Sequence, residues 1–218
     1  GGASSRMKRS LSQSKLSEDE KNLAAKVHKS LIPLGKEKKP LLFYLISNAV
    51  AAGITDIYLI TSPENEAFQK CVGSSEKNNS FAGANVHFAI QHPKEGYIKP
   101  LGTADAVEQT LVQYPKLLEQ TFIICNGDNL YSKQAFKKLL KPREVKNALI
   151  SYARSGLEFK DERIEKFAVM DIDSSGYLKK IIEKPDPKIV EKYRDTTGEI
   201  RVSMNIFSFN GKQLNPYL

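Results

Sequence analysis

Thr121-Phe122-Ile123-Ile124-Cys125-Asn126-Gly127-Asp128-Asn129 is the stretch from which the fold is predicted. Its first five residues form a continuous apolar run, which is typical of a strand at the centre of a parallel sheet whose two faces are both covered. Its last four residues favour a turn and place the carboxylate of Asp128 directly after this strand. The stretch therefore predicts a buried central strand with a polar loop at its carboxyl end.

Helical and extended segments alternate on both sides of this strand. Pro40 opens a helix with one apolar face over Leu41–Ala52, Gly53 ends it, and Thr55–Thr61 has the pattern of a strand. We also expect helices over 18–28, 62–72, 103–114, 132–141 and 187–193, strands over 86–91, 147–153 and 201–209, and a hairpin of 166–172 with 177–183. Repeated β–α units predict the α/β class, with a Rossmann-like three-layer α/β/α arrangement around a mixed, mostly parallel sheet.

Length and composition limit the class of protein. A chain of 218 residues with 40% hydrophobic residues can bury one good core. No apolar run approaches the roughly 20 residues of a membrane span, so we expect no membrane partner. The two cysteines, Cys71 and Cys125, are too few for a disulfide framework and lie among apolar neighbours, which favours buried thiols and a cytoplasmic location.

The formal net charge of +8 has two interpretations. A nucleic-acid partner would need basic residues clustered on one face together with aromatic side chains. The lysines are instead spread along the chain beside many acidic residues. This pattern favours a solvated surface and a small polyanionic substrate, and we expect no nucleic-acid partner.

Candidate ligand-binding residues stand where expected elements meet. In open α/β sheets, ligands bind at the carboxyl ends of the strands. Asp128 and Gln91 each stand at the end of an expected strand, whereas Gly102 and Thr103 stand at a helix N-terminus, where backbone N–H groups face a ligand. Each has a structural interpretation on its own, but their joint occurrence favours a shared site.

Gly1-Gly2-Ala3-Ser4-Ser5-Arg6-Met7 combines two glycines, two hydroxyls and a guanidinium. Glycines let the backbone N–H groups of such a loop surround a phosphate, and Arg6 adds a charged fork of donors. The same composition suits a flexible leader. The residues by themselves leave both interpretations open.

Six motifs, in order along the chain, resemble those of the sugar-1-phosphate nucleotidyltransferase family. Gly1–Met7 is similar to the family's Gly-Gly-x-x-Ser/Thr-Arg loop, and Lys29–Leu34 is similar to its Pro-Lys-x-Leu-x-Pro-Val segment, with His28 in place of the first proline. Pro100–Val107 is similar to the loop that holds the base, and Gly127-Asp128 to the metal-binding Gly-Asp. Glu183-Lys184-Pro185 is similar to the sugar-facing Glu-Lys-Pro, and Val202–Phe207 to the strand that follows it. The family more often has Gly where Asn205 stands. Within the family, the motifs are most similar to those of glucose-1-phosphate adenylyltransferases.

The resemblance implies an activity and a set of site residues. An NTP and a sugar-1-phosphate would give an NDP-sugar and pyrophosphate, with Mg²⁺ as cofactor. Catalytic roles are implied for Arg6, Lys29 and Asp128, of which Asp128 would also hold the metal. Nucleotide binding is implied for Gly1, Gly2, Ala3, Ser4, Ser5, Gln91, Gly102 and Thr103. Sugar-phosphate binding is implied for Glu183, Lys184 and Asn205.

The resemblance also leaves some points open. We expect residues 1–218 to be a single nucleotidyltransferase catalytic domain without the family's first strand, which would precede Gly1, and without the C-terminal part that supplies a second metal-binding aspartate. Two alternatives remain, namely phosphocholine or another small phosphate as the acceptor, and a regulatory subunit that binds nucleotides without catalysis. The NTP, any effector and a homo-oligomeric state are also left open.

Overall fold

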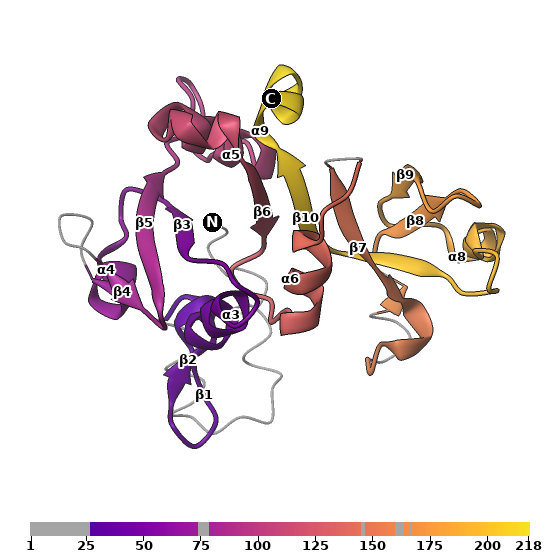
Figure 1. The fold of residues 1–218 in the computed structure, drawn as a ribbon, viewed down its shortest axis with the longest axis horizontal. Helices are drawn as coiled ribbons and strands as arrows, with labels where there is room; N and C mark the ends of the chain where they lie inside the picture. The colour runs from indigo at the N-terminus through magenta and orange to yellow at the C-terminus, as the bar shows by residue number, and fades with distance from the viewer. Residues whose placement is uncertain (1–26, 74–78, 145–146, 160–163, 166) are drawn as a thin grey trace. The chain divides into compact units, whose positions relative to one another are not determined.

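Residues 27–73, 79–144, 147–159, 164–165 and 167–218 are described by a computed structural model (Figure 1). The chain divides into two compact units. The first takes the described residues up to Phe122 together with Asn126–Pro142 and Phe209–Leu218, and the second takes Ile123–Cys125 and Arg143–Ser208. Most of the helix expected over 18–28 lies outside the described residues, and Val27 and His28 are not helical.

The elements follow the expected order closely. From the N-terminus they are η2 (Lys29–Leu31), β1 (Pro33–Leu34), β2 (Lys39–Pro40), α3 (Leu41–Val50), β3 (Asp56–Thr61), α4 (Glu66–Val72), β4 (Ser80–Phe81), β5 (Ala84–Ile90), α5 (Thr103–Gln113), η3 (Pro115–Glu119), β6 (Thr121–Cys125), α6 (Lys133–Leu140), β7 (Ala148–Ala153), η4 (Arg154–Gly156), β8 (Val169–Ile172), β9 (Leu178–Ile182), α8 (Pro187–Val190), η5 (Glu191–Tyr193), β10 (Arg201–Asn210), α9 (Gly211–Leu214) and η6 (Asn215–Tyr217). The short pairs β1–β2 and β4–β5 were not predicted. Two-residue strands are too short to show a period.

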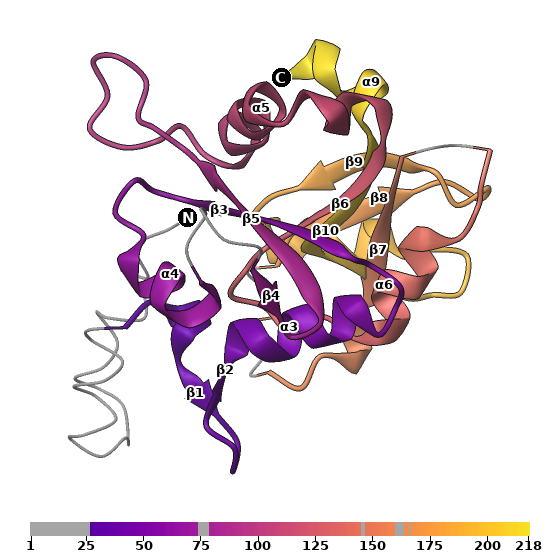
Figure 2. The same cartoon turned by 60° about the vertical axis from the view of Figure 1, so that its left-hand side comes forward.

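The first unit is built on the three-stranded sheet β3–β5–β4. β3 and β5 are parallel, so Ile57 lies beside Val86 and Tyr58 beside His87. Ile57 and Val86 belong to a core formed with apolar residues of α3 and α4. Tyr58 and His87 point to the opposite face, where both rings contact Tyr114 at the end of α5. Figure 2 shows α3 and α5 on either side of the sheet, which is the expected helix–sheet–helix layering.

Helix α3 illustrates how local sequence produces this packing. Its buried residues Leu42, Leu45, Ile46 and Ala49 recur at intervals of three and four, which places them on one helical face. Gly53, at φ +109, lies in a backbone region that favours glycine and ends the helical segment just before β3. The apolar period and the glycine were both readable in the sequence.

The second unit is mainly antiparallel. β10 pairs antiparallel with β7 and with β8, and β8 pairs antiparallel with β9. The β8–β9 turn is held by Asp173, whose Oδ1 accepts N–H bonds from Ser175 and Tyr177. A small core of Val169, Val190, Ile200 and Val202 lies within this unit.

The mixed α/β class is confirmed, with two differences in detail. Parallel pairing is described for β3 and β5, whereas the strands after Asn147 form antiparallel pairs, of which β8 and β9 are joined by a hairpin turn. β6 was expected to be a buried central strand. This was wrong for the described residues, because β6 stands at the end of its strand order and its side chains are half-buried or exposed. An apolar run indicates a strand but does not specify its number of neighbours.

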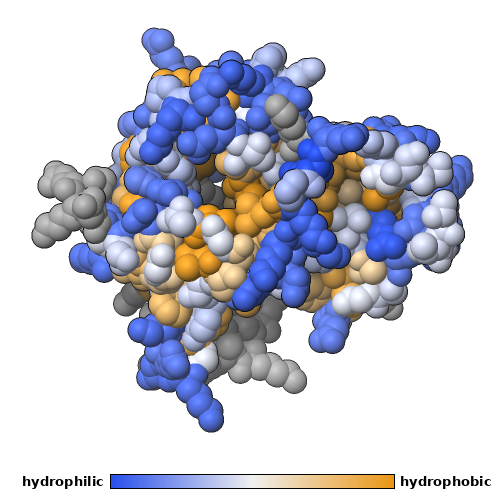
Figure 3. All heavy atoms as spheres, in the orientation of Figure 1, coloured by the Kyte–Doolittle hydropathy of each residue, from blue (hydrophilic) through white to orange (hydrophobic). Residues whose placement is uncertain are grey.

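Figure 3 shows hydrophilic residues over much of the visible face, with hydrophobic residues exposed among them. Among the described residues, no helix combines the length and the apolar character needed to span a membrane.

Candidate nucleotide site

Lys29 and Asp128 meet directly, although 99 positions separate them. Lys29 begins the short η2 turn, which His28 caps by accepting the N–H of Ser30 at Nδ1. Asp128 lies in the turn after β6. The Lys29 Nζ atom is 3.2 Å from Asp128 Oδ2, and each side chain keeps 39% of its surface exposed. Two motifs that the sequence placed in one site are thus brought together, and the direct ion pair between them was not predicted.

The surroundings of Asp128 can be tested against a divalent cation. Among the described residues, no group of three or more His, Cys, Asp or Glu side chains could enclose a metal ion. Mg²⁺ does not need such a cage, because it usually keeps several waters and binds through one or two carboxylates together with substrate phosphates. The half-exposed carboxylate of Asp128 fits a Mg²⁺ ion of this kind.

A second pair of candidates is joined by hydrogen bonds. The side chain of Gln91, which directly follows β5, is 3% exposed. Its Nε2 donates to the backbone oxygen of Gly102 at 3.0 Å and to Asp105 Oδ2 at 2.6 Å. Protein acceptors therefore occupy both amide hydrogens of Gln91. The remaining hydrogen-bonding atom of this side chain is Oε1.

Asp105 is a buried residue that the sequence analysis did not single out. It is 7% exposed and lies in the first turn of α5. The bond from Gln91 lowers its pKa most, and Gln109 and the charge of Lys94 lower it further, while burial acts in the opposite direction. Asp105 belongs to the Pro100–Val107 motif, and a carboxylate among apolar helix positions was the available signal.

Gly102 and Thr103 form the N-terminus of α5. Gly102 is the N-cap, and its φ of +123 lies in a region that side chains rarely adopt. No described atom lies within 4 Å of where its Cβ would stand. Glycine is thus required here by the backbone conformation, and the open space leaves room beside it. Thr103 opens the helix and is exposed.

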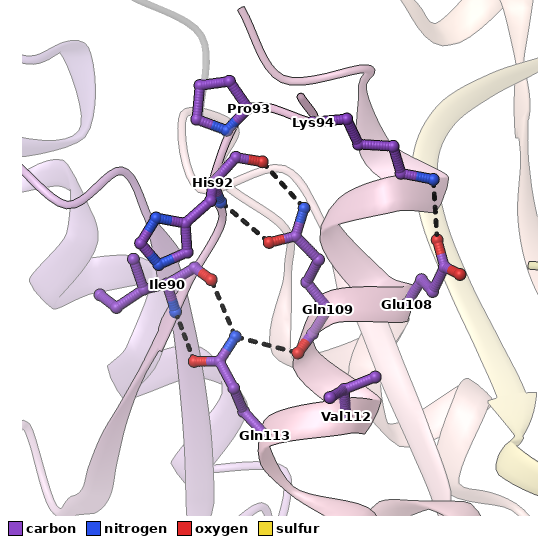
Figure 4. Close-up of a pocket in the computed structure, with 8 residues that line it drawn as sticks. All are labelled: Ile90, His92, Pro93, Lys94, Glu108, Gln109, Val112 and Gln113. Carbon is purple, nitrogen blue, oxygen red and sulfur yellow. Dashed lines mark hydrogen bonds and ion pairs between the residues drawn. The ribbon is translucent and has the colours of Figure 1, made fainter. Parts of the chain in front are cut away.

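Two further glutamines attach α5 to the end of β5 (Figure 4). Gln109 accepts the N–H of His92 and donates to its carbonyl, and Gln113 does the same for Ile90 at 2.8 Å in both directions. Asp105, Gln109 and Gln113 stand four residues apart, so they form one stripe on the helix. We call these three residues the α5 polar ladder.

The ladder borders a shallow hollow of about 670 Å³ lined by Ile90, His92, Pro93, Lys94, Glu108, Gln109, Val112 and Gln113. Figure 4 shows that the polar groups here largely face one another, with Lys94 directed at Glu108. The hollow contains none of the candidate site residues.

The candidates for sugar-phosphate binding belong to the second unit. Glu183 and Lys184 are exposed after β9, and Lys184 has a φ of +46. Asn205 is exposed in an irregular part of β10, where the register with β7 shifts between Ser203 and Phe207. Its φ is +57. Among residues with a side chain, asparagine tolerates this left-handed conformation best, which explains a position shared by Asn and Gly.

The phosphate-loop candidates Gly1, Gly2, Ala3, Ser4, Ser5 and Arg6 lie outside the described residues. Their predicted roles therefore rest on the sequence alone.

Comparison with known proteins identifies relatives of the chain. The model of the family described as "Nucleotidyl transferase" matches residues 21–217. Glucose-1-phosphate thymidylyltransferase of Neisseria gonorrhoeae is 28% identical over 160 residues, which cover 73% of this chain and 49% of that protein. The chain thus spans about half the length of this curated relative.

A solved structure supports the fold assignment. The crystal structure of HddC from Yersinia pseudotuberculosis superposes with a TM-score of 0.54 at 18% identity, and the match covers 88% of this chain and 71% of that one. Together with the family match, this likeness confirms a Rossmann-like nucleotide-diphospho-sugar transferase fold. Because the family match extends over most of the sequence, the chain belongs to the nucleotidyl transferase family.

Proposed function

We propose that the protein containing this chain joins an NTP and a sugar-1-phosphate to form an NDP-sugar and pyrophosphate, with Mg²⁺ as cofactor, in the cytoplasm. The observation that carries the proposal is the contact between Lys29 and Asp128. A cation for phosphates and a carboxylate for a metal stand side by side, each accessible to solvent. Phosphoryl and nucleotidyl transfer both use this combination, because charge on phosphate oxygens must be neutralised.

The reaction is an in-line substitution at the α-phosphorus of the NTP. An oxygen of the sugar phosphate forms the new bond to phosphorus, the bond from the α-phosphorus to the bridging oxygen breaks, and pyrophosphate leaves with that bonding electron pair. The attacking oxygen is already anionic, so no strong general base is needed. The protein must bring two polyanions together, and correct positioning alone contributes about 7–11 kcal/mol to such reactions.

Lys29 is proposed to contact the α-phosphate and the incoming sugar phosphate. Its ammonium group would leave Asp128 for the phosphates, and the Asp128 carboxylate would then be available to hold Mg²⁺. The metal supplies charge neutralisation on the phosphate oxygens. Gly1–Ser5 and Arg6 are proposed to hold the leaving diphosphate, which follows from the sequence resemblance.

The other candidates are proposed to bind the two ends of the substrates. Gln91, Gly102 and Thr103 lie together at the start of α5 and would contact the base. Glu183, Lys184 and Asn205 would contact the sugar and its phosphate. Two of these three hold positive φ values, and such loop-like backbone is common where a ligand approaches.

The proposal is tested by pyrophosphate release with and without Mg²⁺. The panel crosses the four NTPs and dTTP with several sugar-1-phosphates and phosphocholine. The full-length protein should be used, because this chain covers about half of its curated relative. We expect release with one NTP and one sugar-1-phosphate, dependent on Mg²⁺. Pyrophosphate release with phosphocholine but with no sugar-1-phosphate would mean that phosphocholine is the acceptor. No release with any combination would reject the catalytic function.

A further inference from the structure

The hydrogen bonds around Gln91 determine which way its side-chain amide faces. The Asp105 carboxylate offers only acceptors when ionised, and so does the carbonyl of Gly102. Both lie within hydrogen-bonding distance of Gln91 Nε2, at 2.6 Å and 3.0 Å. A rotated amide would place Oε1 against two acceptors and lose both bonds. The orientation of Gln91 is therefore set by chemistry as well as by geometry.

Asp105 is itself held on several sides. Gln109 Nε2 donates to both carboxylate oxygens at 3.2 Å, and Lys94 Nζ lies 3.9 Å from Oδ1. The same Gln109 is anchored to the backbone of His92. Gln109 thus fixes the position of Asp105 relative to the end of β5, and Asp105 in turn fixes the orientation of the Gln91 amide.

The amide oxygen of Gln91 is the group that remains. No donor from the described residues reaches Oε1, yet the side chain is 97% buried, since its exposed fraction is 3%. Among the described residues, Arg143 Nε is the side-chain polar atom that is fully buried without a partner. Because Gln91 Oε1 is not such an atom and has no protein donor, it keeps contact with solvent. A nearly buried carbonyl oxygen that faces outward without a protein donor is suited to receive a hydrogen bond from a ligand.

We propose that Asp105 is a positioning residue that presents Gln91 to the nucleotide base as an acceptor only, so that the base must offer an N–H donor at this point. This inference rests on the proposed function, because it takes the ligand beside Gln91 to be an NTP. Asp105 does not touch the substrate in this arrangement. It acts on specificity through Gln91.

The test pairs each nucleotide with an analogue whose base lacks the N–H donors of its pairing edge. ATP is paired with purine riboside triphosphate, UTP and dTTP with their N3-methyl derivatives, CTP with the triphosphate of pyrimidin-2-one riboside, and GTP with N1-methyl-ITP. Affinity is measured by calorimetry on the full-length protein. The discrimination ratio is the Kd of the analogue divided by the Kd of the nucleotide that the protein prefers. For the wild-type protein we expect a ratio of about ten or more, since one hydrogen bond to a nearly buried group is lost.

Asp105→Asn is the decisive variant. An asparagine can both donate and accept, so in this variant only the Gly102 carbonyl still opposes rotation of the Gln91 amide, and the ratio should fall to about three or less. The KM for the NTP should rise while kcat changes little. Asp56→Asn is the matched control, because Asp56 also pairs with a β5 side chain, His87, at 3.1 Å but does not contact Gln91. The control should keep the wild-type ratio.

The outcomes separate the two proposals. If no NTP binds to the wild-type protein, the proposed function and this inference both fail. If an NTP binds but the wild-type protein accepts its donor-free partner equally well, or if Asp105→Asn keeps the full ratio, only the inference fails. Should Asp105→Asn not fold, the Gln91 side-chain amide is followed by NMR in the wild-type protein, where rotation of the nucleotide-bound amide would overturn the inference and a fixed, slowly exchanging amide would support it.

Discussion

Lys29 and Asp128 neutralise each other in the absence of substrate. Their charges are in contact and half-exposed, so the pair itself adds at most about 1 kcal/mol to the free energy of unfolding. A contact of such low structural value is easily exchanged for contacts with phosphates and a metal. Replacement of either residue should therefore affect turnover far more than stability.

Asp128→Ala is expected to remove Mg²⁺-dependent turnover, with a loss of about a hundredfold or more, because a carboxylate on the metal is lost. Pyrophosphate release at saturating Mg²⁺ measures the loss, and thermal unfolding should be nearly unchanged. Glu119→Ala is the control, since Glu119 forms a similar exposed pair with Lys212 at 2.6 Å in the same unit. Release by Asp128→Ala at close to the wild-type rate would contradict the assignment.

Lys29→Ala is expected to lower kcat with little change in the affinity for the NTP. The ammonium group is proposed to act on charge that develops during the reaction, so its removal should affect the transition state more than the ground state. Steady-state kinetics and calorimetric titration of the NTP separate the two effects. Lys212→Ala serves as the control, and an unchanged kcat for Lys29→Ala would reject the role.

Asn205 is expected to tolerate glycine and to reject a β-branched residue. At a φ of +57, Asn205→Gly removes the side chain without strain, whereas Asn205→Val should lower the free energy of unfolding by about 1–2 kcal/mol. Urea denaturation followed by circular dichroism measures both variants. Equal stability of the valine variant and the wild-type protein would show that this backbone conformation is not required.

At the scale of elements, the α5 polar ladder attaches a helix to a strand by hydrogen bonds rather than by apolar packing. Gln109 and Gln113 reproduce the pattern of a neighbouring strand, with one N–H and one C=O bond to each of His92 and Ile90. Apolar side chains pack with little directional preference, whereas these paired bonds are satisfied at one registration only.

Gln113→Leu should loosen this attachment locally. It removes the partners of the Ile90 N–H and C=O groups, and loss of these bonds should cost about 0.5–1.5 kcal/mol each. Hydrogen exchange at the Ile90 amide should accelerate, while the amide of Gln91, which bonds to Thr61 on β3, should keep its protection. An unchanged exchange rate of the Ile90 amide would mean that the bonds from Gln113 do not stabilise the attachment of α5 to β5.

The same elements show how far the sequence can predict the fold and the site. The helix α3 was found because its apolar residues repeat at helical spacing, and the strand β3 was found from its run of apolar and β-branched residues. Lys29 and Asp128 were expected in one site from motifs and Gln91 from its place at a strand end, but Asp105 was overlooked. Its role depends on Gln91, which approaches it only through folding, and no local pattern in the sequence records that contact. β6 was placed too centrally for the same reason.

At the scale of the whole molecule, each unit contains a carboxylate with a lowered pKa. Asp105 in the first unit is held by Gln91, and Asp195 in the second is held first by Thr197 and then by Arg201. A lowered pKa means that the folded state binds the proton less tightly than the unfolded state does. The stability that these groups contribute is thus present above their ordinary pKa of 3.8 and is lost as the pH falls below it.

Asp195→Asn should make the second unit less sensitive to acid. We expect lower stability than the wild-type protein at pH 7 and a shallower loss of stability between pH 5 and pH 3, because the variant has no carboxylate to protonate at this turn. Urea midpoints measured across this range give both slopes. Parallel slopes for the variant and the wild-type protein would contradict a lowered pKa for Asp195.

The glutamines of α5 have a consequence for how copies of the molecule meet one another. Unpaired backbone groups along a strand invite association with a second chain and are a common origin of aggregation. On the side of β5 away from β3, Tyr114 bonds to the carbonyl of Phe88, and the two glutamines cover the groups of Ile90 and His92. The residues that set the position of α5 therefore also occupy backbone groups that could otherwise pair with a strand of a second chain.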